Sequence, residues 1–233
     1  PYEMVINSNP CLAYLMRDNT LLLQILTIAH VYGHNDFFTN NRLFGFSRAE
    51  LTIETFKNHA DRIRSYIQDP SIGYEKVERI LDAAHALRYQ TNRILGTKRL
   101  PPEEQKQRIL DEYRRRNQPD GFGKPPNPEP PPNLTKIPLE PEDDILWFMA
   151  EYGRLEEWEK DILRIVRAET EYFLPQIETK IMNEGWASFW HYRILNSLDL
   201  SPELHLEFLK RHHQVIRPHP GGLNPYHLGF TML

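Results

Sequence analysis

The sequence predicts a mainly α-helical fold, and three observations carry that prediction. Apolar residues recur at helical spacing through most of the 233 residues. Capping residues and prolines stand where helices would begin or end. The chain shows no alternation of apolar and polar residues long enough for a useful β-strand, and no internal repeat. A chain of this length can bury one core, or one core with a small additional lobe.

Five helices are expected in the first half of the chain: a short one from Pro10, then residues 21–38, 47–68, 74–95 and 101–116. Segment 21–38 is apolar on most faces, which predicts a buried central helix. Ser47 and Glu50 have the spacing of a capping box, so a helix is expected to start at Ser47. Gly96 is expected to cap the helix over 74–95 at its C-terminal end.

The composition changes between Pro119 and Pro141, where nine of the 19 prolines lie. Such a segment buries little surface, which favours an extended, polyproline-like crossover linker; a ligand for a proline-binding domain is the alternative. We therefore expect an N-terminal helical half at 1–116, a linker at 117–141 and a C-terminal helical half at 142–233. The two halves are expected to pack on each other as one domain.

Four helices are expected in the second half, at residues 142–151, 155–174, 177–198 and 201–213. Pro175 is expected to separate the second of these from the third, because proline interrupts the hydrogen bonding of a helix interior. Residues 218–225 are rich in glycine and proline and are expected to form a loop.

Composition also excludes several classes of protein. The net charge of −4 argues against a nucleic-acid binder that works by phosphate neutralisation. A single cysteine, Cys11, excludes an internal disulfide framework and a cysteine-rich zinc site. The most apolar stretch, 21–31, is too short to span a membrane. The chain starts at Pro1 and shows no signal peptide, so we expect a fragment of a longer protein.

Two histidines four residues apart give the first indication of a function. His30 and His34 lie in the expected buried helix, and this spacing puts both imidazoles on one face, one turn apart. Zincins hold their metal with the same H-x-x-x-H spacing. Val31 stands where those enzymes carry the glutamate that acts as general base. The pattern predicts a metal site that lacks its usual general base. The alternative is that both histidines are structural, and they would then also need hydrogen-bond partners when buried.

Further candidates lie in the second half of the chain. Glu184 and His191 are seven residues apart and share a helix face with Ser188, so they can complete a site begun by the two histidines. A glutamate favoured near a helix start by the helix dipole is the alternative for Glu184. Glu169 and Tyr172 share a face of the preceding helix. Either can supply a further ligand or the missing base, with surface ion pairing as the alternative for Glu169.

Several segments resemble the stage V sporulation protein R (SpoVR) family. The resemblance is carried by residues 2–10, 28–38, 179–187 and 224–230, with shorter matches between them. Segment 183–187, Asn-Glu-Gly-Trp-Ala, also resembles the third-ligand helix of gluzincin aminopeptidases, in which that glutamate binds zinc. The family resemblance implies a bacterial, cytoplasmic protein that is associated with the spore cortex in spore formers. Relatives also occur in bacteria that form no spores, so the activity is not specific to sporulation. The resemblance implies no particular reaction.

Two functions of different class are consistent with these residues. The first is a zinc-dependent hydrolase, a peptidase or amidase for a peptide or peptidoglycan-related substrate, with a zincin-like arrangement of the two helices. The second is a non-catalytic, metal-stabilised scaffold that binds a partner protein, in which four side chains close the metal site. A redox metal such as iron is a third option, because mixed imidazole and carboxylate ligands suit iron and manganese as well as zinc.

The hydrolase hypothesis assigns a role to each candidate residue. His30, His34 and Glu184 would hold one divalent metal. His191 would be a fourth ligand or would stabilise the oxyanion. Glu169 would be the substitute base and Tyr172 would donate a hydrogen bond to the reaction intermediate.

Overall fold

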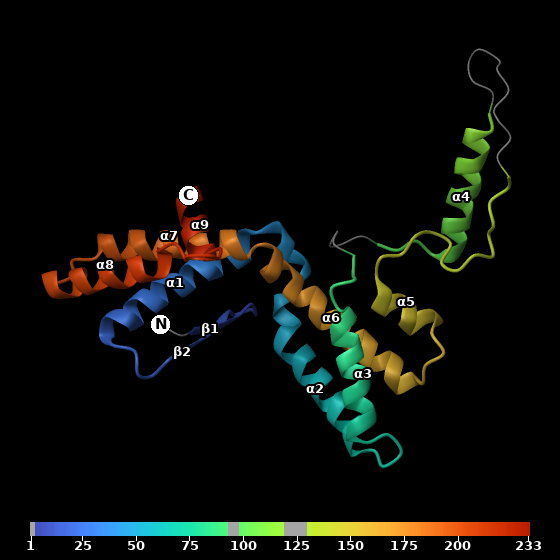
Figure 1. Ribbon diagram of the computed structural model, residues 1–233, viewed down its shortest axis with the longest axis horizontal. Coiled ribbons are helices and arrows are strands. Elements are labelled where there is room, and N and C mark those ends of the chain that lie inside the picture. The colour runs from blue at the N-terminus through green and yellow to red at the C-terminus, as the bar shows by residue number, and fades with distance from the viewer. Residues whose placement is uncertain (1–2, 93–97, 119–129) are drawn as a thin grey trace.

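A computed structural model of the chain describes residues 3–92, 98–118 and 130–233. The prediction of a mainly α-helical fold is confirmed. The described residues form nine α-helices and one two-stranded sheet. Figure 1 shows the helices in two neighbouring groups, with one helix standing apart from both.

The first group contains the helices that carry His30, His34 and His191. It consists of α1 (Leu21–Asn40), α7 (Lys180–Ser197), α8 (Pro202–Ile216) and α9 (Pro225–Met232), with the strands β1 (Glu3–Ile6) and β2 (Leu12–Leu15) beside α1 (Figure 1). α1 begins at Thr20, whose hydroxyl accepts a hydrogen bond from the Leu23 amide. A buried apolar cluster joins α1, α7 and α8 and consists of Leu22, Leu26, Ala29, Leu195 and Phe208. Burial of these side chains is the main favourable term holding the three helices together.

The second group surrounds a separate apolar cluster. It consists of α2 (Thr52–Gln68), α3 (Tyr74–Leu87), α5 (Ile145–Tyr152) and α6 (Glu157–Glu178). The buried residues of the cluster are Val77, Ala84, Leu146, Ala150, Ile162, Leu163 and Val166. α4 (Pro102–Arg116) projects away from both groups in Figure 1. α6 leads into α7 through Thr179, so one continuous stretch of chain joins the two groups.

A buried carboxylate fixes the start of α5. Asp144 is fully buried, and its carboxylate accepts hydrogen bonds from Arg99 and from Arg167 of α6. The same side chain caps α5 by accepting from the Trp147 amide. Two guanidinium groups and a cap hydrogen bond provide the partners that a buried charge requires.

The expected short helix at Pro10 is wrong. Residues 3–15 form an antiparallel hairpin in which Glu3 pairs with Leu15 and Ile6 with Leu12. Strands of four residues are too short for their alternation to be distinguished from helical spacing. The hairpin matters for function because it brings Glu3 next to α1.

Two of the expected helix ends lie several residues from those in the structure. The second helix starts at Thr52, because the Ser47 hydroxyl donates to the Phe44 carbonyl and accepts from the Asn7 side chain instead of capping a helix. Short 3₁₀ turns, Arg42–Phe46 and Ala49–Leu51, fill the intervening segment. The helix that starts at Tyr74 ends at Leu87, and the expected cap Gly96 lies outside the described residues.

Pro175 does not break its helix. α6 continues through it to Glu178, one turn further, and the Thr179 amide and hydroxyl both donate to the Pro175 carbonyl. A proline in the last turn removes one hydrogen bond but leaves most of the helix intact.

At the end of the expected loop, α9 begins at Pro225, and the Asn224 side chain caps it.

The two halves of the chain contact each other in both groups of helices. α1 packs on α7, and α3 packs on α6. Of the expected linker, residues 119–129 lie outside the described part of the chain, and residues 130–141 contain no helix or strand. Within the described ranges, no helix is both long enough and apolar enough to cross a lipid bilayer.

Candidate metal centre

The crossing of α1 and α7 builds the centre. A Cβ atom on Gly33 would lie 2.6 Å from the Ala187 Cα, a distance that real Cβ atoms do not show, so only glycine allows this approach. Trp186 reinforces the contact by donating its indole N–H to Asp36 of α1. The close approach places the face of α1 that carries His30 and His34 directly against the face of α7 that carries Glu184.

The three side chains converge at this crossing. The Glu184 Oε2 atom lies 3.6 Å from the His30 Nε2 atom and 3.5 Å from the His34 Nε2 atom. The two imidazole rings meet edge to face with their centroids 4.6 Å apart. Both histidines are buried. The spacing predicted for the sequence motif therefore produces a shared site, with both Nε2 atoms directed to one carboxylate.

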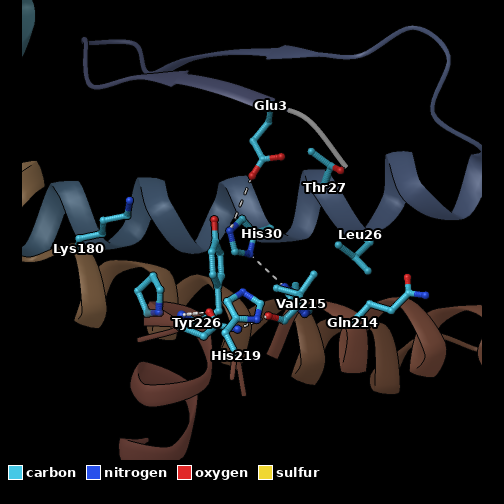
Figure 2. Close-up of a pocket in the computed structure, with 12 residues that line it drawn as sticks. Glu3, Leu26, Thr27, His30, Lys180, Gln214, Val215, His219 and Tyr226 are labelled. Carbon is cyan, nitrogen blue, oxygen red and sulfur yellow. Dashed lines mark hydrogen bonds and ion pairs between the residues drawn. The ribbon is translucent and has the colours of Figure 1, made fainter. Parts of the chain in front are cut away.

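A second carboxylate comes from the hairpin. The Glu3 Oε1 atom lies 3.9 Å from the His30 Nε2 atom. Figure 2 shows Glu3 reaching toward His30 from the strand beside α1. One ligand atom from each of Glu3, His30 and His34 lies within 4.8 Å of the others. Glu3 could not be predicted from helical spacing, because it lies on a strand.

These residues fit a divalent metal. The His30 Nε2 atom is buried and has no hydrogen-bond partner among the described residues. An unpaired buried nitrogen is costly unless something binds it. Two ligands of one tetrahedral zinc are roughly 3.3 Å apart, given zinc–nitrogen distances of about 2.0–2.1 Å. The 3.5 and 3.6 Å separations to Glu184 are close to that value.

Asn183 sets the orientation of His34. The His34 Nδ1 atom lies 2.8 Å from the Asn183 Oδ1 atom. An amide oxygen only accepts, so Nδ1 carries the proton and Nε2 keeps its lone pair. Burial, together with the charge of His30, lowers the pKa of His34 to about 4. The imidazole is therefore neutral at pH 7, which is the form that binds metals.

Burial and neighbouring charge act differently on the two carboxylates. Burial raises the pKa of Glu3, and the nearby His30 imidazole offsets part of that rise. Burial would also raise the pKa of Glu184, but the nearby imidazoles of His30 and His34, together with the Tyr226 hydroxyl, bring it below its usual value. Glu184 is therefore the more strongly ionised of the two carboxylates and the better anionic ligand.

His191 lies behind the centre. Its Nδ1 atom is 3.0 Å from the His30 Nδ1 atom, and its Nε2 atom is 2.8 Å from the His212 Nδ1 atom. Both ring nitrogens therefore contact other imidazoles, and neither is left for the metal or for an oxyanion. The sequence placed His191 on the correct helix face but did not reveal His212 as its partner.

The other two candidates have partners outside the histidine cluster. The Glu169 Oε1 atom lies 3.1 Å from the His59 Nδ1 atom. The Tyr172 hydroxyl donates to the Asn7 carbonyl over 3.1 Å, and burial raises the pKa of that hydroxyl. Glu169 nevertheless lines the same cavity as Glu184, whereas the Tyr172 hydroxyl is engaged with the backbone.

The centre lies between two cavities. One, of about 380 Å³, has Glu3, His30 and Tyr226 in its wall (Figure 2). The other, of about 980 Å³, runs along α6 and has Glu169 and Glu184 in its wall. Lys180 borders both cavities. The smaller cavity therefore borders Glu3 and His30, and the larger one borders Glu184.

Comparison with known proteins identifies one family. The family profile described as "SpoVR like protein" matches residues 1–233. The protein YcgB of Escherichia coli (strain K12), described as uncharacterized, is 40% identical over 251 residues. That alignment covers 99% of this chain and 49% of YcgB, so the chain spans about half the length of this relative. No solved structure matches the chain.

Proposed function

Because the chain belongs to the SpoVR-like protein family, we propose that it is a cytoplasmic, metal-dependent hydrolase that acts in processes related to the cell wall. Zinc is the proposed metal, with iron or manganese as alternatives. The proposed substrate class is a peptide or a peptidoglycan-related amide. The resemblance to the stage V sporulation protein R family, which is associated with the spore cortex, suggests this class. The relative's printed description supplies no reaction, so the site carries the argument.

One observation carries the proposal. The Nε2 atoms of His30 and His34 both face the Glu184 carboxylate, at 3.6 and 3.5 Å, in a buried position. Two imidazoles on one helix and a carboxylate on a second make a zincin-like arrangement, which is the order expected from the sequence. The unpaired His30 Nε2 atom supports a ligand role over a purely structural one.

The surrounding residues can perform the tasks that amide hydrolysis requires. A divalent metal at this position would polarise the scissile carbonyl and make a water more acidic. Burial, together with the nearby Glu184 carboxylate, raises the pKa of the Tyr226 hydroxyl, so it remains protonated and able to donate. Lys180, on the border of both cavities, can bind a carboxylate group of a peptide substrate.

Two carboxylates are available for the general base that Val31 cannot provide. Val31 lines a separate groove with Cys11, on the hairpin side of α1. Glu169 faces the larger cavity, and Glu3 stands beside His30. The substitutions Glu169→Gln and Glu3→Gln distinguish the two carboxylates. Substitution of the general base should abolish hydrolysis but leave the metal bound, whereas substitution of a metal ligand should lower the metal content.

The proposal is tested first by metal content. Mass spectrometry of wild-type protein, purified without chelator, should find about one equivalent of metal, and His34→Ala should lose it. His213→Ala, which removes an exposed histidine of α8, is the matched control and should keep the metal. Absence of metal from the wild type, even after addition of zinc, iron or manganese, would contradict the proposal.

A second candidate function is a metal-stabilised scaffold that binds a partner. The observation that favours it is Glu3, which brings a fourth donor to the site and could close it to water. Spectroscopy of the cobalt-substituted protein separates the two functions. An exchangeable water on cobalt supports the hydrolase, and a four-coordinate site made of side chains supports the scaffold.

A further inference from the structure

Three imidazoles from three helices form a continuous row that ends at the metal centre. His30 on α1 contacts His191 on α7 through their Nδ1 atoms, 3.0 Å apart. His191 in turn contacts His212 on α8, with 2.8 Å between its Nε2 atom and the His212 Nδ1 atom. The three residues are 4%, 0% and 1% exposed, so the contacts are shielded from bulk water.

The row admits only two arrangements of protons. A neutral imidazole has one N–H group and one lone pair, and each contact between rings needs one of each. The choice made by one ring therefore determines the choice of the other two. In the first arrangement His30 donates through Nδ1 to His191, and His191 donates through Nε2 to His212. In the second, every donation is reversed.

The two arrangements have opposite consequences for the centre. The first leaves a lone pair on the His30 Nε2 atom, which a metal needs. The second puts an N–H group there instead. That group would lie 3.9 Å from the Glu3 carboxylate and 3.6 Å from the Glu184 carboxylate, both too long for a hydrogen bond. A metal bound at the centre requires the first arrangement, because it takes up the lone pair of the His30 Nε2 atom.

The surroundings of His212 keep this imidazole neutral. Its ring lies among Tyr192 of α7, Phe208 of its own helix and Phe230 of α9, with centroids 4.8, 5.9 and 5.0 Å away. Burial in this aromatic environment lowers the pKa of His212 to about 4, and the charge of His213 adds to the effect. A neutral His212 can accept through Nδ1, which the first arrangement requires.

We propose that His191 and His212 are positioning residues that hold His30 in the tautomer with a lone pair on Nε2. His212 accepts from His191, His191 accepts from His30, and the metal-facing nitrogen is thereby left unprotonated. The proposal rests on the proposed function, because it gives the row a purpose only if the centre holds a metal. It also assigns His191 a role one contact removed from the metal rather than on it.

The tautomer can be observed directly in the wild-type protein. Nitrogen-15 NMR of the metal-free chain, labelled at histidine, distinguishes protonated from unprotonated ring nitrogens. His30 is expected with its proton on Nδ1, and His191 with its proton on Nε2. A proton on the His30 Nε2 atom would overturn the proposal, whatever the protein hydrolyses.

Zinc titration of three variants tests the same point by affinity. His212→Leu removes the acceptor and is expected to lower zinc affinity by about 10–100-fold, the usual effect of losing the partner of a ligand. His212→Asn keeps an acceptor near the Nδ1 position and is expected to restore most of the affinity. His205→Leu, two turns away on the same helix, is the matched control and is expected to bind as wild type.

The outcomes separate this proposal from the proposed function. If wild-type protein binds neither zinc nor iron nor manganese, the proposed function fails. If the wild type binds zinc and a folded His212→Leu variant binds it equally well, the positioning role alone is overturned. Far-ultraviolet circular dichroism of each variant establishes that it is folded. Should His212→Leu not fold, the tautomer measurement on the wild type still decides the question.

Discussion

Glu184 is the side chain that both histidines of the centre share. Its carboxylate lies within 3.6 Å of each Nε2 atom, so a metal bound to both imidazoles would also meet this negative charge. Glu184→Gln keeps the shape of the side chain and removes the charge. We expect zinc affinity to fall by at least about tenfold, or ~1.4 kcal/mol, in calorimetric titration. Glu178→Gln, an exposed carboxylate at the end of α6, should have no effect; equal affinities of wild type and Glu184→Gln would exclude Glu184 as a ligand.

His212 makes stability depend on pH. Its pKa is about 4 in the folded chain, below the ordinary value of 6.5, so the unfolded chain takes up a proton first as pH falls. Folding stability is therefore complete above pH 6.5 and decreases toward pH 4, by at most ~1.4 kcal/mol per pH unit for this residue. The titratable groups that face His212 are His191 and Tyr192 of α7 and the neighbouring His213.

Urea unfolding of chelator-treated protein at pH 7 and pH 5 measures this effect. Wild type should lose more stability between the two pH values than His212→Asn, which keeps an acceptor but does not titrate. His34 and His191 are present in both proteins, so their contributions cancel in the comparison. Equal losses would mean that His212 is not held neutral by burial.

Sequence alone could indicate single residues only where helical periodicity relates them. His30 and His34 share a face because they are four apart, and Glu184 could be added because its segment resembles a ligand helix. Glu3 and His212 could not be found in this way. Glu3 reaches the site through a hairpin, and His212 through the packing of α8 on α7, and neither contact leaves a periodic signal.

Small residues control how closely the helices of the centre approach. α7 meets α9 where Gly185 faces Gly229, and a Cβ on Gly185 would lie 2.4 Å from the Gly229 carbonyl carbon. Gly185→Ala should therefore force the helices apart and destabilise the fold by about 1–3 kcal/mol. Because Glu184 is the adjacent residue, zinc affinity should fall as well.

The matched control for this substitution is Gly222→Ala. A Cβ at Gly222 has no neighbour within 4 Å, so the melting temperature should stay within about 2 °C of wild type. Thermal unfolding of both variants with and without zinc measures both effects. A Gly185→Ala protein as stable as Gly222→Ala would show that α7 and α9 do not approach this closely.

The existence of most helices could be predicted, but several of their ends could not. Long periodic segments such as Leu21–Asn40 are set by their own pattern. Ends depend on tertiary partners: Ser47 is taken up by Asn7 and Phe44, so the helix starts later, at Thr52. α6 passes through Pro175 because its last turn tolerates one missing hydrogen bond.

Contacts between the two halves of the chain hold the molecule together. The centre itself draws Glu3, His30 and His34 from the first half and Glu184 from the second. We propose that the halves form one domain, so neither can complete the site alone. The expected boundaries at residues 116 and 142 are placed by the proline-rich composition of the segment between them. Composition indicates a linker, but it does not show whether the linker joins two domains or two parts of one domain.

Cleavage within the linker tests this arrangement. A protease site introduced after the exposed Lys136 should allow cutting without unfolding, because residues 130–141 contain no helix or strand. The two pieces should remain together in gel filtration and keep their zinc. Elution as two separate species, or loss of zinc on cutting, would contradict a single domain.

The central claim, that His30, His34 and Glu184 hold a metal with Glu3 beside them, is tested most directly by X-ray absorption of the zinc-loaded chain. We predict two imidazole ligands with oxygen ligands completing the shell, at zinc–ligand distances of about 2.0–2.2 Å. His34→Ala, which should lose the metal, should retain no zinc after gel filtration and therefore give no such spectrum. A shell of water oxygens without imidazole, or a sulfur ligand from Cys11, would contradict the claim.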